Sequence, residues 1–392
     1  MAALDAKGLV EPLFPFLVDI RRRLHMYPEP SGKEYETTRV LQEELESEGI
    51  SCIRPTATGC VAVVKGKKEG KTIALRADID ALPVHELTDL PFSSRKDGVM
   101  HACGHDGHAA ALLGAAKILH RHREHWQGTV MLVFQPSEEY LPSGALAMVE
   151  SGILDGVGAV MGLHIKTDIP VGSCSVEAGP RMAASAGVDI RIKGKGGHGG
   201  TPHEAVDAIV AGAAIISNLQ TIVSRELDKE NSSILSIGTF TAGTGKNIIA
   251  EEAVMSGTCR FYSPDLLPVL RESITRVVQN TAAAFRANAE VSVEPGCPAV
   301  INDGALSEIG VNAAETLWGK ESIILYPKSS LNEDFSHYAA IAPIHYAMIG
   351  ARNEHIGCVF PHHSPYFTLD EASLPLAAQY YVQFALDYLA HA

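Results

Sequence analysis

The sequence predicts an α/β protein in which a discontinuous domain, built on a central mixed sheet flanked by helices, is interrupted by an inserted ferredoxin-like α+β domain. Up to about residue 180, short apolar strands alternate with helical stretches, as in doubly wound folds. From residue 184 the predicted order becomes β-α-β-β-α-β, the split arrangement of ferredoxin-like domains. A strand and a long helix near the C-terminus then indicate a return to the first domain.

The first domain is expected to begin with helices. Val10–Met26 has apolar residues at helical spacing and ends before Pro28 and Pro30. Ser31, with Glu34 three residues later, has the pattern of a capping box that opens a second helix. The following β-rich and Ala/Leu-rich runs predict strands over 61–64, 72–77, 128–135 and 159–164, and helices over 109–120 and 145–150.

The inserted domain is predicted from a change of pattern at residue 184, where an alternating strand leads into a Gly-rich turn. Its expected elements are strands over 188–193, 234–240, 254–261 and 291–293, and helices over 204–219 and 266–285. A helix over 305–317, a strand over 344–349 and a helix over 371–389 complete the first domain. The predicted boundaries are therefore 1–183, 184–296 and 297–392, with the first and last parts forming one domain.

Composition narrows the class of protein. The chain has 392 residues, 46% of them hydrophobic and 20% charged, which is typical of a soluble protein with two or three domains. A net charge of −14 without a basic face argues against nucleic acid as a partner. Seven cysteines without a CxxC pair indicate reduced thiols and a cytoplasmic location. We find no signal-peptide pattern and no uninterrupted apolar run near the ~18 residues that a membrane span needs, so no membrane association is expected.

The stretch Met100–Ala110 is the most informative part of the chain. It places three histidines and one cysteine within eight residues, with a glycine on each side of the pair His105-Asp106. At extended spacing, Cys103 and His105 project in the same direction. A thiolate beside an imidazole is a ligand pair for a borderline-soft divalent metal. A polar loop that merely contains histidines is the alternative interpretation.

Further donor residues follow the predicted strands. Because open α/β sheets place their sites at the carboxyl edge of the strands, these residues are expected to lie together. The candidate metal ligands are Cys103, His105, Glu139, His164 and one of the pair His362/His363. Five ligands exceed the needs of one tetrahedral zinc and suit two metal ions about 3.5–4 Å apart. Taken singly, His164 could be a buried core histidine and the pair His362/His363 a surface feature.

Two adjacent carboxylates, Glu138 and Glu139, leave the end of an apolar strand. Adjacent side chains point in different directions, so one can bind metal while the other faces an open coordination position. A carboxylate there can accept a proton from metal-bound water and return it to a leaving group. A solvated acidic turn is the alternative interpretation.

Other motifs carry less weight. The run Gly194–Gly199 matches a dinucleotide fingerprint only in part, because Pro202 and His203 interrupt the turn before the helix. The histidines in His120–His125 lie at a predicted helix C-terminus, where cationic side chains suit the helix dipole. The sequence has no HExxH, G-x-S-x-G or Walker pattern, which argues against three common hydrolase mechanisms.

Several of these motifs occur in the order found in a known family. The chain resembles the metal-dependent aminoacylase/carboxypeptidase superfamily, in particular its amidohydrolase branch of indole-acetyl-amino-acid hydrolases, hippurate hydrolases and N-acetyl-amino-acid deacetylases. The resemblance runs from about residue 25 to the C-terminus. The runs that carry it are Met100–Ala110, Gln135–Glu139, Gly162–His164, Gly194–His203, Glu333–Ser336 and His363–Phe367.

The resemblance implies roles for individual residues. Glu138 would be the general base, and His198 would polarise the scissile carbonyl from its own subunit or from a partner subunit. Asp80 would orient a metal ligand, and Asn247 and Arg260 would contact the substrate carboxylate. The two divalent metal ions would be held by Cys103, His105, Glu139, His164 and His363.

Together these observations predict a di-metal hydrolase that cleaves the amide bond of N-acyl amino acids by Glu-assisted attack of metal-bound water. Zinc is favoured by the thiolate and imidazoles, with manganese or cobalt as alternatives. The inserted domain would act as a lid and join the chain into a homodimer or higher homo-oligomer. The alternatives are a dipeptidase or aminopeptidase on the same scaffold and, further off, a non-catalytic metal- or ligand-binding protein. The sequence does not identify the acyl group or the amino acid.

Overall fold

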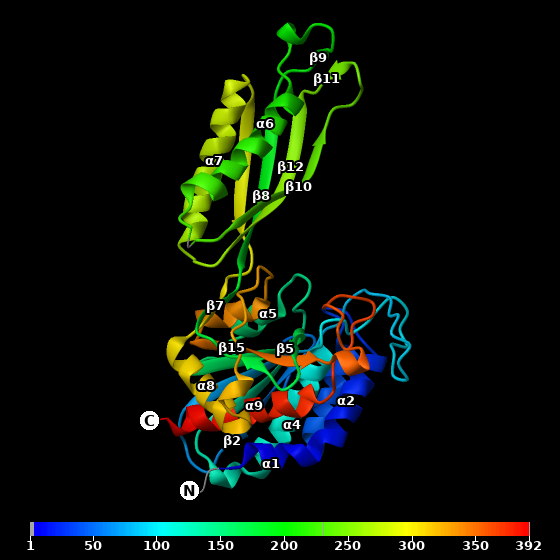
Figure 1. The fold of residues 1–392 in the computed structure, drawn as a ribbon, viewed down its shortest axis with the longest axis vertical. Helices are drawn as coiled ribbons and strands as arrows, with labels where there is room; N and C mark the ends of the chain where they lie inside the picture. Colours follow the sequence, from blue (N-terminus) through cyan, green and yellow to red (C-terminus); the bar gives the residue numbers. More distant parts are fainter. Residues whose placement is uncertain (1–3, 230, 392) are drawn as a thin grey trace. The chain divides into compact units, whose positions relative to one another are not determined.

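Two units share the chain in the computed structural model, which describes residues 4–229 and 231–391 (Figure 1). Unit 1 comprises Met1–Arg181, Ile301–Pro327 and Asp334–Ala392, and unit 2 comprises Met182–Val300 and Lys328–Glu333. The sequence analysis assigned the short segment 328–333 to the first domain. It belongs to unit 2 because the backbone N–H of Ala183 donates to the carbonyls of Ser329 and Leu331.

Unit 1 is built on a seven-stranded mixed sheet, as predicted. Its four central strands are parallel, because β4, β3, β5 and β15 pair side by side in one direction. The flanking strands β1, β2 and β6 pair antiparallel. In spatial order the strands are β1 (Cys52–Ile53), β2 (Cys60–Lys65), β4 (Thr129–Gln135), β3 (Thr72–Asp78), β5 (Ala159–Pro170), β15 (Ile344–Arg352) and β6 (Cys174–Ser175).

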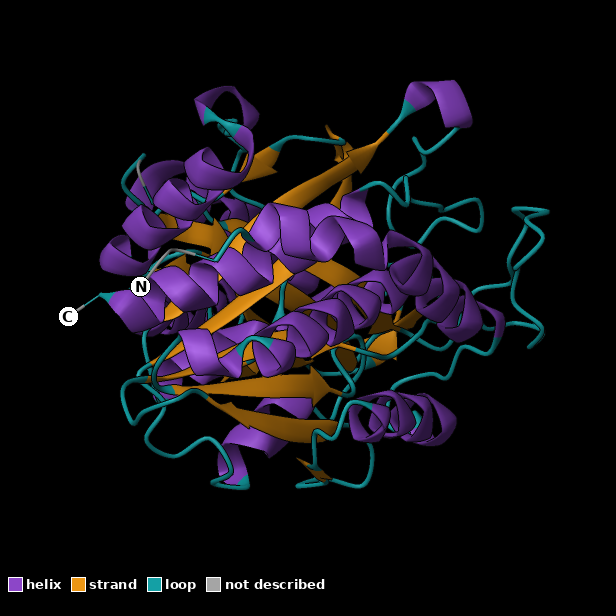
Figure 2. Cartoon of the chain, turned by 90° about the horizontal axis from the view of Figure 1, so that it is seen from below, coloured by secondary structure: helices purple, strands orange, loops and turns teal. Residues whose placement is uncertain are grey.

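A layer of helices packs on one face of this sheet, and Figure 2 looks onto that layer with the strands behind it. α4 is its centre: it contacts α2, α9 and strand β3, and nearly all of its side chains are buried. The unit 1 helices are α1 (Ala6–Val10), α2 (Phe14–Met26), α3 (Tyr35–Ser47), α4 (His105–Arg121), α5 (Gly144–Glu150), α8 (Gly304–Trp318) and α9 (Ser373–Ala390). Single turns are η1 (Glu11–Leu13), η2 (Arg123–His125), η5 (Lys320–Ser322), η6 (Asp334–Ala340) and η7 (Glu354–Ile356).

Unit 2 has the predicted ferredoxin-like arrangement. Its four antiparallel strands lie in the order β10-β12-β8-β13, and helices α6 and α7 pack against each other and on the sheet. The elements are β8 (Ala184–Lys193), α6 (Ala208–Thr221), β10 (Ile234–Ala242), β12 (Glu252–Phe261), α7 (Leu266–Ala284) and β13 (Asn288–Pro295). Shorter elements are β9 (Gly197–His198), η3 (Pro202–Glu204), η4 (Ile222–Glu226) and β11 (Ile248–Ile249), and the paired strands β7 (Gly179–Met182) and β14 (Val300–Asn302) lie where the chain changes units.

One helical stretch in the described part of the chain, Ala208–Glu226, is long and apolar enough to cross a membrane by length and composition alone. It consists of α6 and the turn η4 that follows it. One face of α6, formed by Ala208, Ala211, Ile215 and Leu219, is buried in unit 2. Core packing therefore accounts for part of its apolar character.

Three predicted features differ in the structure. The capping box at Ser31 is wrong, because α3 begins at Tyr35 and the Ser31 hydroxyl donates to Asp80 instead. The helix predicted from residue 109 begins at His105, so His105 and His108 lie in its first turn rather than in a loop. Strand β5 continues past His164 to Pro170, so His164 lies within the strand. In each case the bounds of the element differ from those that the local sequence pattern predicts, because the polar side chains have partners elsewhere in the fold.

Candidate active site

The motif that contains Cys103 and His105 leads into the first turn of α4. Gly104, at the N-cap of this helix, has a φ of 95°, a left-handed conformation that glycine adopts at little cost. The turn allows Cys103 to precede the helix while His105 begins it. Both side chains are buried, and together with Glu139 they bring possible ligand atoms within 4.8 Å of one another.

The predicted donor residues of unit 1 converge around Cys103 and Glu139. The Cys103 Sγ atom lies 3.5 Å from His164 Nε2 and 3.6 Å from His362 Nδ1. On the other side, Glu139 Oε1 lies 3.9 Å from His105 Nε2 and 3.2 Å from His363 Nε2. Segments separated by up to 260 residues in sequence (363 minus 103) therefore meet at the carboxyl edge of the parallel strands.

Three buried atoms in this cluster fit a divalent cation. His105 Nε2, Glu139 Oε1 and His362 Nε2 make no hydrogen bond within the described residues. A buried polar atom without a partner is costly, and such atoms mark positions for water or ions. Thiolate, imidazole and carboxylate donors around one space match the ligand chemistry of zinc and related metals. The residues present therefore fit a metal centre.

Asp80 sets the orientation of His105, as the resemblance implies for it. Its Oδ1 atom lies 3.1 Å from His105 Nδ1, which leaves His105 Nε2 facing the cluster. Its Oδ2 atom accepts hydrogen bonds from the Ser31 hydroxyl at 2.6 Å and from the backbone N–H of Glu139 at 3.0 Å. Burial alone would raise the pKa of Asp80, but the hydrogen bonds from His105 and Ser31 hold it below its ordinary value.

A second carboxylate–histidine pair supports His164. Asp78 Oδ1 lies 2.6 Å from His108 Nδ1, and His108 Nε2 accepts the backbone N–H of Ile165 at 2.8 Å. The rings of His108 and His164 are in edge contact, with centroids 4.7 Å apart. Sequence analysis gave neither Asp78 nor His108 a role. The signal that could have found them is their spacing of two and three residues from Asp80 and His105.

Burial and neighbouring charges shift the pKa values of the cluster in different directions, and Asp78 and Cys103 raise the pKa of His105 well above its ordinary value. Burial, with Glu139 nearby, raises the pKa of the Cys103 thiol to about 12. Burial and the rings of His108 and His362 hold the pKa of His164 well below its ordinary value, so that imidazole is neutral. Cys103 would lose its thiol proton on binding a divalent cation, whose positive charge would stabilise the thiolate.

The sequence left open which of His362 and His363 is a ligand, and the resemblance selected His363. The structure places His362 beside Cys103 and His164, with its Nδ1 3.1 Å from the Cys103 carbonyl oxygen. His363 is half-exposed, lies against Glu139, and has a φ of 66° that is uncommon for a residue with a side chain. Both histidines thus belong to the cluster, and the choice of His363 stays a prediction.

Glu138 lies in the loop between β4 and α5, next to the donor residue Glu139. Its Oε1 atom accepts a long hydrogen bond, 3.4 Å, from the backbone N–H of Asp334. The carboxylate is partly exposed. This combination of a fixed position and access to solvent is compatible with proton transfer, as the sequence analysis predicted for Glu138.

The remaining predicted site residues lie in unit 2. His198 ends β9 and is exposed, and the backbone N–H of Gly199 donates to the carbonyl of Asn247 on the neighbouring segment. Arg260 pairs with Ser185 at the opposite end of the β12–β8 ladder from the pair Glu252–Lys193. Its Nη1 atom is buried without a hydrogen-bond partner in the described part of the chain. His198 and Asn247 therefore lie together, and Arg260 lies apart from them.

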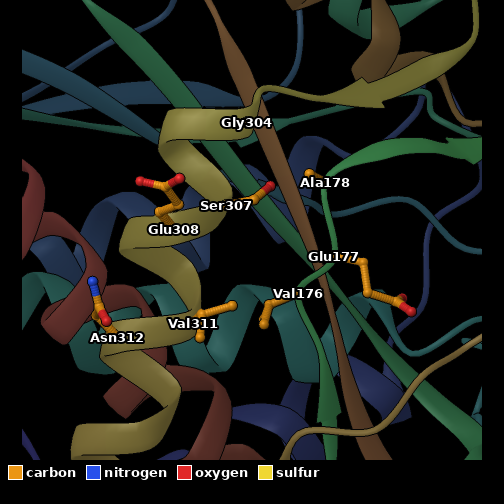
Figure 3. A pocket seen from close by; sticks show the side chains of 8 residues that line it. All are labelled: Val176, Glu177, Ala178, Gly304, Ser307, Glu308, Val311 and Asn312. Carbon is orange, nitrogen blue, oxygen red and sulfur yellow. The ribbon is translucent and has the colours of Figure 1, made fainter.

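A cavity of about 510 Å³ lies elsewhere in unit 1, between α8 and the stretch that follows β6 (Figure 3). The Glu177 side chain points away from the α8 residues in this view, and its carboxylate pairs with Arg181 at 2.6 Å. The cavity is lined by Val176, Glu177, Ala178, Gly304, Ser307, Glu308, Val311 and Asn312. None of the predicted site residues lines it, so donor chemistry rather than cavity volume locates the candidate active site.

Comparison with known proteins identifies the family. The profile of Peptidase family M20/M25/M40 matches residues 74–387, which include the whole donor cluster. The chain belongs to this family. M20 relatives cover nearly the full length of the chain, so both units are part of the resemblance.

Three M20 relatives show how similar the chain is to characterised members. An N-acetylcysteine deacetylase of Bacillus subtilis is 41% identical over 372 residues, 94% of this chain and 96% of that protein. IAA-amino acid hydrolase ILR1-like 4 of Arabidopsis thaliana is 38% identical over 381 residues, 96% of this chain and 86% of that protein. The crystal structure of the Bacillus subtilis YXEP protein, a dinuclear metal binding peptidase from the M20 family, has a TM-score of 0.87 and 38% identity, covering 97% of this chain and 99% of that one.

We predict that Cys103→Ser lowers the metal content of the purified protein by at least about half. A serine hydroxyl at this position is a harder donor and does not ionise as the thiol does beside a cation. Elemental analysis after dialysis measures the content, and Cys52→Ser, which changes a cysteine outside the cluster, is the control. Unchanged metal content in Cys103→Ser would remove this residue from the ligand set.

Proposed function

We propose that this M20 protein is a di-metal hydrolase that cleaves the amide bond of N-acyl amino acids. The observation that carries the proposal is the convergence of Cys103, His105, Glu139 and His164 on one space, with unpartnered donor atoms facing it. The similar relatives are named for deacetylation of N-acetylcysteine and hydrolysis of IAA-amino acids, and both reactions cleave N-acyl amino acids. The free thiols of the described cysteines are in keeping with a cytoplasmic location.

Two divalent cations would be held by Cys103, His105, Glu139, His164 and His363, with His362, the other member of the candidate pair, as a further donor beside Cys103. When bound, such ions lower the pKa of water and polarise a carbonyl oxygen. Zinc suits the thiolate and imidazoles, whereas manganese or cobalt are the alternatives that the mixed donor set allows. Asp80 would keep His105 in the tautomer whose Nε2 faces the cation.

Glu138 would act as general base and then general acid. It is adjacent to Glu139 in sequence, and the hydrogen bond from Asp334 fixes one of its oxygens. Its carboxylate would accept a proton from the attacking water and deliver it to the nitrogen of the departing amino acid. The same group thus serves both halves of the reaction without an additional titrating residue.

His198 would donate to the developing oxyanion, and Arg260 and Asn247 would bind the carboxylate of the amino acid. The length of strand β12 in unit 2 separates His198 from Arg260. Arg260 is eight residues along β12 from Glu252, which corresponds to about 27 Å at 3.4 Å per residue. Because His198 and Asn247 lie together beyond the Lys193 end of this ladder, they and Arg260 of one chain would serve different active sites, and Asn247 would reach the substrate carboxylate from the same subunit as His198. We infer that His198 acts in the active site of a partner subunit.

The surface of unit 2 offers a place for that partner. β10 is an edge strand of the sheet, and its Ile234 and Phe240 side chains are 47% and 38% exposed. On α6, Ile209 and Val210 are 42% and 49% exposed. Unpaired edge strands beside exposed apolar residues are typical of surfaces that join two chains. A second copy of this chain, paired along β10 and α6, would give an isologous homodimer.

A panel of substrates tests the proposed activity. N-acetyl amino acids, hippurate and indole-acetyl amino acids are compared with free dipeptides, each with zinc, manganese and cobalt. We expect kcat/KM to be at least about tenfold higher for the best N-acyl amino acid, because the similar relatives are named for hydrolysis of N-acyl amino acids. Faster cleavage of dipeptides would favour a dipeptidase or aminopeptidase, and no turnover of any amide would favour a metal-binding protein.

Glu138→Ala tests the proposed base. We expect the variant to keep its metal content while kcat falls by about 10²–10⁴-fold, because a positioned general base contributes that much. Elemental analysis and steady-state kinetics on the best substrate measure the two quantities. Near-normal turnover with full metal content would show that another group moves the proton.

Subunit complementation tests the role of His198. When Glu138→Ala and His198→Ala chains are co-expressed, half of the dimers are expected to be mixed, and each mixed dimer has one complete site if His198 acts in the partner. Activity should then recover to about a quarter of the wild-type value. Action of His198 within its own chain predicts no recovery, because every site would lack one of the two groups.

A further inference from the structure

The buried carboxylate of Asp334 accepts hydrogen bonds that the proposed reaction does not explain. Oδ1 accepts hydrogen bonds from Arg76 Nη2 at 3.1 Å and from Gln135 Nε2 at 2.8 Å. Oδ2 accepts from the Ser143 hydroxyl at 2.7 Å and from the backbone N–H of Ala145 at 3.0 Å. Asp334 is only 2% exposed, so each of these bonds lies in a low-dielectric environment.

The hydrogen bonds from Gln135 and Ser143 come from the two ends of one loop. Gln135 is the last residue of β4, and Ser143 is the N-cap of α5. Between them lies the loop 136–142, which carries Glu138 and Glu139. A single carboxylate therefore holds both ends of this loop, and the backbone N–H of the same residue reaches Glu138 Oε1 in its middle.

The loop itself needs such support. Ser137 has a φ of 49°, a left-handed conformation that a residue with a side chain retains only where its surroundings hold it. Within the loop, the backbone N–H of Ser137 donates to Glu34, and that of Glu139 donates to Asp80. Glu139 is thus held by Asp80, and Glu138 Oε1 accepts a longer bond, 3.4 Å, from the backbone N–H of Asp334.

Charge explains why an aspartate stands at this position. Arg76 is fully buried and pairs with Asp78 at 2.8 Å as well as with Asp334 at 3.1 Å. Charge-assisted bonds are shorter and stronger than neutral ones, so an ionised carboxylate holds Gln135 and Ser143 more firmly than an amide would. An asparagine at position 334 would also point its NH₂ group at hydrogen-bond donors, either those that now face Oδ1 or those that now face Oδ2.

Asp334 also marks a change of unit. Glu333 belongs to unit 2 and Asp334 to unit 1, so the chain returns to unit 1 at this peptide bond.

We propose that Asp334 is a positioning residue that fixes the Glu138–Glu139 loop and through it places the Glu138 carboxylate for proton transfer. The second part of this proposal rests on the proposed role of Glu138 as the base. The first part, the hold on the loop, does not depend on that role, and the two parts have separate readouts.

Asp334→Asn is the principal test. We expect kcat to fall by about 10- to 100-fold with KM within about threefold, as for other residues that orient a catalytic group. Metal content should stay unchanged, because Asp80 holds Glu139 independently. Hydrogen–deuterium exchange of the backbone amides in 136–143 should become faster. Asp370→Asn, another buried carboxylate with an amide and a backbone donor, is the control and should alter neither kcat nor exchange in this loop.

A double-mutant cycle separates positioning from a general structural defect. In the Glu138→Ala background, Asp334→Asn should change residual activity by less than about twofold, because its effect acts through Glu138. An undiminished loss in that background, or a kcat of Asp334→Asn within twofold of wild type, would overturn the proposal. If Glu138→Ala alone retains normal turnover, the base assignment fails, and loop exchange in Asp334→Asn then decides whether Asp334 holds the loop.

Ser143 keeps the proposal testable if Asp334→Asn does not fold. Ser143→Ala removes the bond to Asp334 together with the N-cap bond from the backbone N–H of Leu146, and it should lower kcat by about 2- to 10-fold with faster exchange in the loop. Ser143→Thr retains the hydroxyl and should recover most of the lost kcat. Equal kcat and equal loop exchange in Ser143→Ala and wild type would contradict the role given to Asp334.

Discussion

The hydrogen bonds of the Asp80 carboxylate are the interactions on which the site depends. Asp80 is almost fully buried, and burial of a charge without partners would be strongly unfavourable. Its partners are the Ser31 hydroxyl, the His105 ring and the backbone N–H of Glu139. Because the last two belong to proposed metal ligands, one carboxylate fixes donors that are 34 residues apart in sequence (139 minus 105).

Two side chains of strand β3, Arg76 and Asp78, continue the buried hydrogen-bond network along the edge of the sheet. Side chains two residues apart in a strand share a face, so Arg76 and Asp78 of β3 point to the same side and pair at 2.8 Å. Asp78 orients His108 beneath the cluster, while Arg76 reaches Asp334 beside the Glu138 loop. Because alternate side chains of β3 share a face, one buried hydrogen-bond network reaches both the proposed metal ligands and the loop that carries Glu138.

Much of this architecture could be predicted from the sequence. Alternating strands and helices gave the sheet of unit 1, and donor residues near predicted strand ends gave Cys103, His105, Glu139 and His164. Features fixed by tertiary contacts could not be predicted. The choice between His362 and His363 depends on a loop whose backbone is held by a hydrogen bond from His363 N–H to the Ala102 carbonyl. Asp334 lies in an irregular segment without periodicity, so its partners could not be inferred from spacing.

The buried donor atoms of the proposed metal centre also affect the stability of the folded state. Without a cation, His105 Nε2, Glu139 Oε1 and His362 Nε2 are buried and make no hydrogen bond within the described residues. A buried polar atom without a hydrogen bond is unfavourable, so a cation that satisfied these atoms would also stabilise the folded state. These donor residues come from the start of α4, the loop after β4 and the loop before α9, so a metal held by them would join three segments of unit 1. The high pKa of the Cys103 thiol makes this linkage pH-dependent: protons compete with the cation, so the metal-dependent part of the stability should decrease as the pH falls.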